Sequence, residues 1–332
     1  MARSTVEFGL RAINAGDRKA RDLIPRLLEV LSRYMASVGE QFEEGVADTP
    51  AWMFLRWINQ LVALLNRPEH EHVESKVLEI ATEYPQALFY PFRVVESNAA
   101  LERNGFTGSS PLFTKLQRYF ARFENLNRWV DSLDCLVYPE HRLKYWLEAL
   151  QEAFPSDAEK NSAQLDRIAG MMLADVAAPE RPGLGTKIGA YNSKFVNGWT
   201  RGLRKFVGEE GTALGSKKHR NFIDDVALLH EKLQEYLRGL GTGERRLADY
   251  SDWLAEYDCS NFYDPREYLE VPGQYEGLAE EPLRERHVKI ASVSARLLVL
   301  ASIRRPKRIT VHGSNEKEYH LLVKGGEDLR LD

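Results

Sequence analysis

The sequence predicts a mainly α-helical fold, an irregular helical solenoid or bundle followed by a partial antiparallel β-sheet. Two observations support this prediction. Apolar residues recur at helical spacing through roughly the first 240 residues. After about residue 266, this pattern gives way to short β-branched or leucine-rich runs bounded by turn residues, which are typical of strands.

Four stretches carry the helical pattern most clearly. Each repeats apolar or aromatic residues three or four positions apart, as one buried helix face requires. These residues are Ile24, Leu27, Leu28 and Leu31; Trp57, Ile58, Leu61, Leu64 and Leu65; Phe113, Leu116, Tyr119, Phe120 and Phe123; and Val226, Leu229, Leu233, Tyr236 and Leu237. Turn signals rich in Gly and Pro separate the stretches. No strict repeat is present, so we expect irregularly stacked helix pairs with these aromatics in the core.

A proline-flanked segment runs from Tyr84 to Phe92. Pro85 suits the first turn of a helix, whereas Pro91 would end or kink it. The segment therefore predicts a short, kinked core helix.

The last part of the chain predicts strands over residues 288–290, 296–300, 308–311 and 319–323. Residues 313–315, Gly-Ser-Asn, lie between the last two and predict a hairpin turn. A small open sheet is marginally stable alone, so we expect the chain to be truncated at its C-terminus.

Composition limits the function classes. The 332 residues carry a net charge of −4 and are 28% charged, so there is no basic excess of the kind that marks nucleic-acid binding. The two cysteines, Cys135 and Cys259, lie in unrelated contexts and indicate neither a disulfide framework nor a zinc site. No signal peptide or run of about 18 apolar residues is present, so we expect a soluble intracellular protein.

The densest group of candidate functional residues lies in the last 34 positions. The loop from Val299 to Pro306 joins two predicted strands, and Lys324 ends a third, followed by Gly325 and Gly326. A hairpin loop with a strand-borne lysine beside it is an arrangement that holds phosphates. The same residues also fit a surface hairpin with a solvated charged tail, and spacing alone does not separate the two.

Other candidates are weaker. Two basic clusters, residues 304–308 and 217–220, fit nucleic-acid binding or import, and fit a solvated face as well. His70 and His72 are two apart, which is wrong for ligands on one helix face, so we expect no metal site there.

The chain resembles the phosphatidylinositol-3-kinase-related kinase family. The resemblance rests on residues 304–309 with 322–330, on 269–275, and on 84–88, which is similar to a signature of the family's helical FAT region. Residues 57–58 with 62–65, together with 189–191 and 194–195, are most similar to the DNA-repair branch of the family. The resemblance covers nearly the whole chain and implies C-terminal FAT helical repeats over 1–98, a helical FKBP–rapamycin-binding-like region over 99–265, and the beginning of a PI3/PI4-kinase-type N-lobe over 266–332.

The resemblance also implies an ATP site. Leu300, Pro306 and Leu322 would line the adenine pocket, Ser302 would cap the terminal phosphates, and Lys324 would grip the phosphates. Glu327 would orient that lysine or the phosphates, and Asp332 would be a further acidic position of the pocket. One departure is Leu331, where the family usually has Gln.

The family places its catalytic loop and its metal-binding Asp beyond the ATP lysine, and no such loop occurs earlier in this chain. We therefore expect neither catalytic nor Mg²⁺-binding residues within the chain, and an inactive isolated chain. The resemblance implies a nuclear full-length kinase that uses Mg-ATP, phosphorylates proteins, and is recruited to double-stranded DNA ends by the Ku heterodimer, with no membrane partner. A non-catalytic helical scaffold and a segment of a target-of-rapamycin-like kinase stay open as alternatives.

Overall fold

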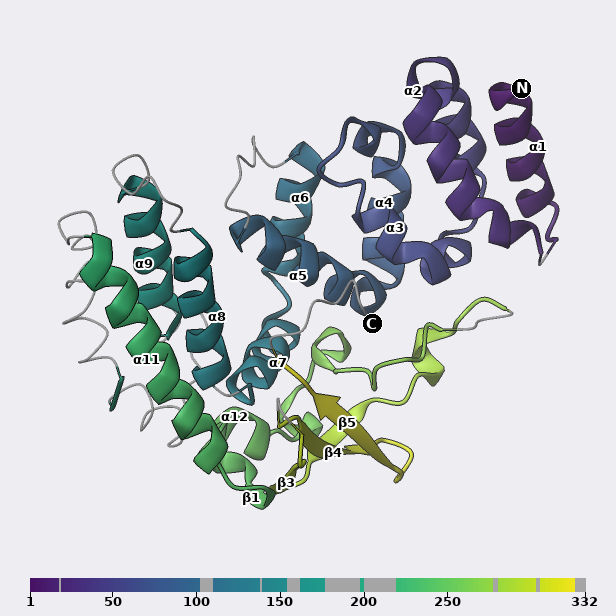
Figure 1. Ribbon diagram of the computed structural model, residues 1–332. Coiled ribbons are helices and arrows are strands. Elements are labelled where there is room, and N and C mark those ends of the chain that lie inside the picture. The colour runs from purple at the N-terminus through teal and green to yellow at the C-terminus, as the bar shows by residue number, and fades with distance from the viewer. Residues whose placement is uncertain are drawn as a thin grey trace. The chain divides into compact units, whose positions relative to one another are not determined.

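The computed structural model describes residues 1–17, 19–101, 110–137, 139–153, 162–176, 198–199, 219–276, 280–302 and 305–325 (Figure 1). Helices dominate, and a small antiparallel sheet follows them, which confirms the predicted fold class. The chain forms two compact units, one of residues 1–124 with 270–289 and one of residues 125–269 with 290–332. The two compact units have other boundaries than the three family segments expected over residues 1–98, 99–265 and 266–332. A division by compactness does not test a division by family region, so the three segments stay a prediction.

The first unit is built from helices. They are α1 (Ala2–Asn14), α2 (Ile24–Ala47), α3 (Ile58–Val62), α4 (Glu74–Glu83), α5 (Pro85–Leu101) and α6 (Pro111–Phe120), with the 3-10 turns η1 (Ala20–Leu23), η2 (Ala51–Trp57) and η3 (Pro68–His72). Ser110 caps α6 by accepting the Phe113 N–H, and Pro111 follows at the first helical position. Helices α1 and α2 pack closely because Gly45 leaves room for Leu10: an added Cβ would lie 2.6 Å from its side chain.

The predicted aromatic stripe on α6 is core packing. Phe113 and Phe120 are buried, and their rings pack against Phe92 of α5 at centroid distances of 5.1 and 5.4 Å. Phe89 packs edge-on against Phe120 at 5.3 Å. Such rings contribute through apolar area and through edge-to-face geometry.

The helix expected to be short around Pro91 is longer than predicted. Helix α5 starts at Pro85 as expected, but it contains Pro91 and continues to Leu101. Proline removes one backbone donor from a helix interior. Burial of Leu88, Phe89 and Phe92 on the same helix supplies apolar stabilisation to offset that loss.

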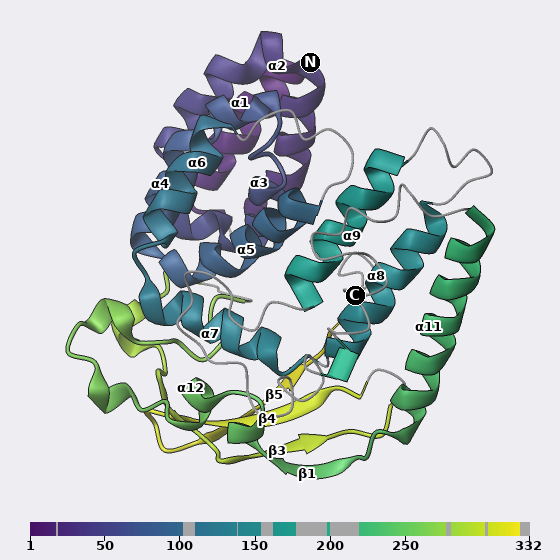
Figure 2. The same ribbon diagram turned by 90° about the vertical axis from the view of Figure 1, so that its left-hand side faces the viewer.

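The second unit combines a helical layer with the sheet. Its helices are α7 (Glu124–Cys135, whose first residue belongs to the first unit), α8 (Pro139–Glu152), α9 (Ser162–Val176), α11 (His219–Gly239) and α12 (Asp252–Ala255), with short 3-10 turns η6 (Leu247–Asp249), η7 (Cys259–Asn261) and η8 (Pro265–Glu267). Trp146, Leu147, Ile168 and Met172 belong to a buried cluster formed by α8, α9 and α11. Figure 2 shows α8, α9 and α11 side by side. Among the described residues, every helix is too short or too polar to cross a membrane.

The sheet has five strands, β1 (Gly243–Arg246), β2 (Ile290–Val293), β3 (Arg296–Val299), β4 (Lys307–Gly313) and β5 (Glu318–Val323). All pairings are antiparallel: β2 and β3 pair with successive parts of one edge of β4, β5 pairs with the other edge, and β1 pairs with β3. The predicted turn at residues 313–315 joins β4 to β5. Strand β1 was not predicted, since its sequence, Gly-Glu-Arg-Arg, lacks apolar alternation.

Candidate nucleotide-binding edge

The strand register brings the β3–β4 loop and the end of β5 to the same end of the sheet. Val299 lies opposite Lys307, and Lys307 lies opposite Val323 on its other side. The next residues along these strands are Leu300, Pro306 and Lys324. The sheet therefore gathers three residues separated by up to 24 positions in sequence.

Strand alternation places the predicted nucleotide residues on one face. Leu297, Val299, Ile309 and Val311 are buried on the core side. Leu298, Arg308 and Leu322 are opposite one another in the register and alternate with the core residues, so they lie on the other face. Leu322 is 47% exposed. Continuing the alternation assigns Leu300 and the exposed Lys324 to that same face.

The loop between β3 and β4 is closed by its own backbone. The Leu300 N–H donates to the Pro306 carbonyl at 3.0 Å, and the Arg305 N–H donates to the Ser302 carbonyl at 3.1 Å. The Ser302 N–H donates to the Leu300 carbonyl, also at 3.1 Å. These backbone donors are engaged within the turn, and the side chain of Ser302 is exposed beside them.

The geometry fits a nucleotide in part. An exposed leucine, a neighbouring cation and a loop hydroxyl at one sheet end are the group types that hold a base and its phosphates. Glu327, Asp332, Leu331 and Arg304 lie outside the described residues, as do residues 189–191, 194–195, 217–218 and 326. Within the described part of the chain, no group of three or more His, Cys, Asp or Glu side chains is placed to hold a metal ion.

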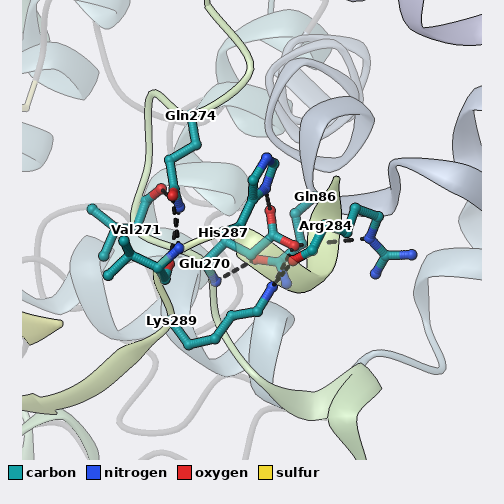
Figure 3. Close-up of polar contacts among 8 residues, drawn as sticks. Gln86, Glu270, Val271, Gln274, Arg284, His287 and Lys289 are labelled. Carbon is teal, nitrogen blue, oxygen red and sulfur yellow. Dashed lines mark hydrogen bonds and ion pairs between the residues drawn. The ribbon is translucent and has the colours of Figure 1, made fainter. Parts of the chain in front are cut away.

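A second polar site, which sequence reasoning missed, lies in the first unit. It is centred on Glu270, whose side chain is 3% exposed (Figure 3). One carboxylate oxygen accepts from Lys289 Nζ at 2.9 Å, and the other lies 3.0 Å from His287 Nδ1. Arg284 adds a longer ion pair at 3.8 Å. The hydroxyl of Tyr275 also interacts with this carboxylate.

The backbone around Glu270 forms a clasp, defined here as residues 270–276 and 280–289. The Val271 N–H donates to the Val288 carbonyl, and Gln274 fixes the turn by accepting the Val288 N–H and donating to both the Val271 and Val288 carbonyls. Gly273 has φ +93°, a conformation that the turn after Pro272 requires and that glycine adopts at little cost.

The clasp is fastened to the start of α5. The side-chain oxygen of the buried Gln86 accepts the Glu270 N–H at 2.9 Å. The ring of Tyr84 meets Tyr275 edge-on at 6.1 Å, and its hydroxyl donates to Glu281 at 3.3 Å. The segments 84–88 and 269–275, both quoted for the family resemblance, thus meet in space through Gln86 and Glu270. Their joint presence in sequence was the one signal for this site, because separations of 17 and 19 residues to His287 and Lys289 follow no local pattern.

Burial raises the pKa of the Glu270 carboxyl, but its interactions with His287, Tyr275 and Lys289 outweigh burial and lower the pKa to about 2. The same surroundings act in the opposite direction on Tyr275: burial first, and then the Glu270 charge, raise the pKa of its hydroxyl well above the ordinary value. The arrangement stabilises an ionised glutamate.

Acidification should loosen the clasp. A carboxyl whose folded pKa is lowered contributes stability above its unfolded pKa of about 4.5 and loses it as the pH falls towards about 2. We expect amide exchange at Val271, corrected for intrinsic rates, to accelerate across this window, reflecting at most about 3 kcal/mol. Glu270→Gln should flatten the dependence, and an unchanged pH profile in that variant would contradict the assignment.

The chain is similar in sequence to several large protein kinases. No protein-family model matches the chain. The DNA-dependent protein kinase catalytic subunit of Dictyostelium discoideum is 32% identical over 338 residues, covering 100% of this chain and 7% of that protein. Its Mus musculus counterpart is 31% identical over 331 residues, covering 98% of this chain and 8% of that protein. The serine/threonine-protein kinase TOR of Oryza sativa subsp. japonica is 26% identical over 328 residues, covering 95% of this chain and 12% of that protein.

The helical region, the sheet and these matches define a segment of a large protein kinase. The chain belongs to the phosphatidylinositol-3-kinase-related kinase family. Over its whole length it is more similar to the two DNA-dependent protein kinase catalytic subunits than to the rice TOR kinase. It spans less than a tenth of the length of those two subunits.

Proposed function

We propose that this chain is the part of a DNA-dependent serine/threonine protein kinase that leads from the helical region into the ATP-binding lobe. The observation that carries the proposal is the sheet end that gathers Leu300, Pro306, Leu322 and Lys324, in a chain similar throughout to such kinases. Residues 1–98 would be FAT repeats, 99–265 the FKBP–rapamycin-binding-like region with its extension, and 266–332 the beginning of the N-lobe.

Each residue of the edge has a distinct task in this proposal. Leu300, Pro306 and Leu322 supply apolar surface against adenine, which suits the 47% exposure of Leu322. Lys324 offers a point charge to the phosphates from the end of a strand. The Ser302 hydroxyl would donate to the terminal phosphates. Glu327 would orient Lys324 or the phosphates, and Asp332 would be a further acidic position of the pocket.

The reaction of the full-length kinase would be transfer of the γ-phosphoryl group of ATP to a protein Ser or Thr hydroxyl. A bond forms between that hydroxyl oxygen and the γ-phosphorus, the bond to the β-phosphate oxygen breaks, and the hydroxyl proton leaves to a base. Bound Mg²⁺ would neutralise charge on the phosphates. The base and the Mg²⁺ ligands would lie outside this chain.

A repair role follows from the same similarity. The names of the Dictyostelium and mouse relatives state dependence on DNA. We propose that the full-length kinase works in the nucleus, acts in the repair of double-strand breaks by non-homologous end joining, and is recruited to DNA ends by the Ku heterodimer. A target-of-rapamycin-like role is the second candidate, favoured by the match to the rice TOR kinase over 95% of the chain.

The isolated chain tests the proposal that the catalytic residues lie outside residues 1–332. Because the base and metal ligands would be missing, we expect the purified 332-residue chain to transfer no phosphate and to bind ATP far more weakly than the full-length kinase. Radiolabelled phosphoryl transfer and calorimetric ATP titration, with the full-length kinase as positive control, measure both. Turnover by the isolated chain would overturn the proposal that catalysis lies elsewhere.

A further inference from the structure

Gly325 and Lys307, two residues beside the candidate nucleotide-binding edge, are packed on the core side of the sheet against residues between α7 and α8. The residues concerned, called here the α7–α8 junction, are Leu136 and Val137 after the end of α7 and Glu140 in the first turn of α8. Figures 1 and 2 both show α7 beside β5. The residues it holds are Gly325, which follows Lys324, and Lys307, which follows Pro306.

Gly325 is in close contact with Val137. A Cβ added at Gly325 would lie 2.1 Å from Val137 Cγ1, 2.9 Å from Cγ2 and 3.1 Å from Cβ. These distances leave no space for any larger residue unless the backbone or Val137 moves. The chain therefore leaves Lys324 along a path fixed by Val137.

Lys307 is held on the core side of the same strand end. It is 2% exposed, and its ammonium lies 5.2 Å from the centre of the Tyr250 ring, within cation–π range. Glu140, fully buried in the first turn of α8, is the opposite charge that acts on it. Burial lowers the pKa of Lys307 to about 7, and Glu140 acts in the opposite direction. The charged form of a lysine this buried depends on neighbours such as Glu140 and Tyr250, since an unpaired buried charge is highly unfavourable.

We propose that the α7–α8 junction positions the nucleotide-binding edge, with Val137 setting the path of the chain at Lys324 and Glu140 holding Lys307 at the base of the β3–β4 loop. Val137 and Glu140 lie three residues apart in the sequence, and Gly325 and Lys307 lie on the side of the sheet away from the proposed nucleotide. In this proposal, the α7–α8 junction sets the distance between the β3–β4 loop and Lys324. Val137, Glu140, Gly325 and Lys307 are positioning residues that touch no nucleotide themselves, and the inference rests on the proposed function.

A steric swap in the full-length kinase tests the first contact. Gly325→Ala should raise the KM for ATP at least about tenfold, because a displacement of about 1 Å can reduce activity a hundredfold. Val137→Ala in the same molecule removes both Cγ atoms and leaves the nearest remaining atom at 3.1 Å, so it should restore most of the KM. Gly239→Ala, where nothing lies within 4 Å of the added Cβ, is the matched control and should leave the KM unchanged.

Substitutions of Lys307 and Glu140 test the second part of the proposal. They also keep the proposal testable if Gly325→Ala does not fold. Lys307→Met should raise the KM for ATP because it removes the positive charge that acts on the buried Glu140, and Lys307→Met with Glu140→Met should recover part of the loss. Unchanged KM values in both series, or KM losses that the second substitutions do not rescue while the melting temperature falls, would overturn the inference. Lys324→Ala distinguishes a failure of the positioning proposal from a failure of the proposed function. If that variant keeps its activity, the proposed nucleotide site itself is wrong.

Discussion

Replacing Lys324 by alanine in the full-length kinase should reduce phosphoryl transfer to background. The lysine would be the cation of the edge that faces the ATP phosphates, and loss of one such electrostatic group lowers turnover by about 10²–10³-fold or more. Because Lys324 is exposed and lies outside the buried core, the melting temperature should not change. Steady-state kinase assays on the purified variant, with a thermal melt alongside, measure both quantities.

The control for that variant is Lys317→Ala. Lys317 is an exposed lysine in the turn between β4 and β5, at the other end of the same hairpin. It should keep full activity, because its side chain is remote from the gathered residues along the strands. Turnover retained by Lys324→Ala, or an equal loss in both variants, would contradict the assignment of Lys324.

Removing the charge of Glu270 should produce the largest loss of stability. Glu270→Gln leaves Lys289 and His287 without their anionic partner in a buried setting, and breaking a buried pair is strongly destabilising. We expect a fall of about 3 kcal/mol in the free energy of unfolding, at the low end of that range because Lys289 keeps some solvent contact. Urea denaturation of the 332-residue chain measures the change.

Hydrogen exchange localises the effect of Glu270→Gln. Faster exchange should concentrate in the clasp and at the start of α5, where Gln86 accepts the Glu270 N–H. The matched control is Glu285→Gln, an exposed glutamate of the same clasp, in the turn η9 (Arg284–Arg286), which should change stability by less than about 0.5 kcal/mol. Equal losses in the two variants would mean that the buried network is not what stabilises the clasp.

The parts of the fold that sequence predicted are those where the period of apolar residues matches the period of the element. Phe113 and Phe120 repeat at helical spacing and are buried as expected. Ile309 and Val311 alternate as a half-buried strand requires, although β4 extends to Lys307 and Gly313 on either side.

The parts that sequence reasoning missed depend on tertiary context. Strand β1 forms because its backbone completes the edge of β3, and pairing does not require apolar side chains there. Helix α5 continues through Pro91 because its buried face outweighs one lost hydrogen bond. Local propensity favours the opposite outcome in both cases, and packing overrides it.

The candidate site divides in the same way. That Leu300 and Lys324 reach one end of the sheet followed from predicting the hairpin strands, since register in a β-hairpin is set by its turn. The burial of Lys307 among Tyr250 and Glu140 was not predictable, because a lysine beside four other basic or proline residues is typical of a solvated loop. The Glu270 network joins residues more than 180 positions apart through Gln86, a separation at which periodicity carries no information.

The most direct test of the account is to read the transcript that encodes this chain beyond the Asp332 codon. We predict that the frame continues, within a few hundred codons, into a catalytic loop with Asp and Asn and then a metal-binding Asp, the residues a protein kinase needs after its ATP lysine. A stop codon directly after Asp332, with no coding exon beyond it, would contradict the kinase proposal and leave a non-catalytic helical scaffold in its place.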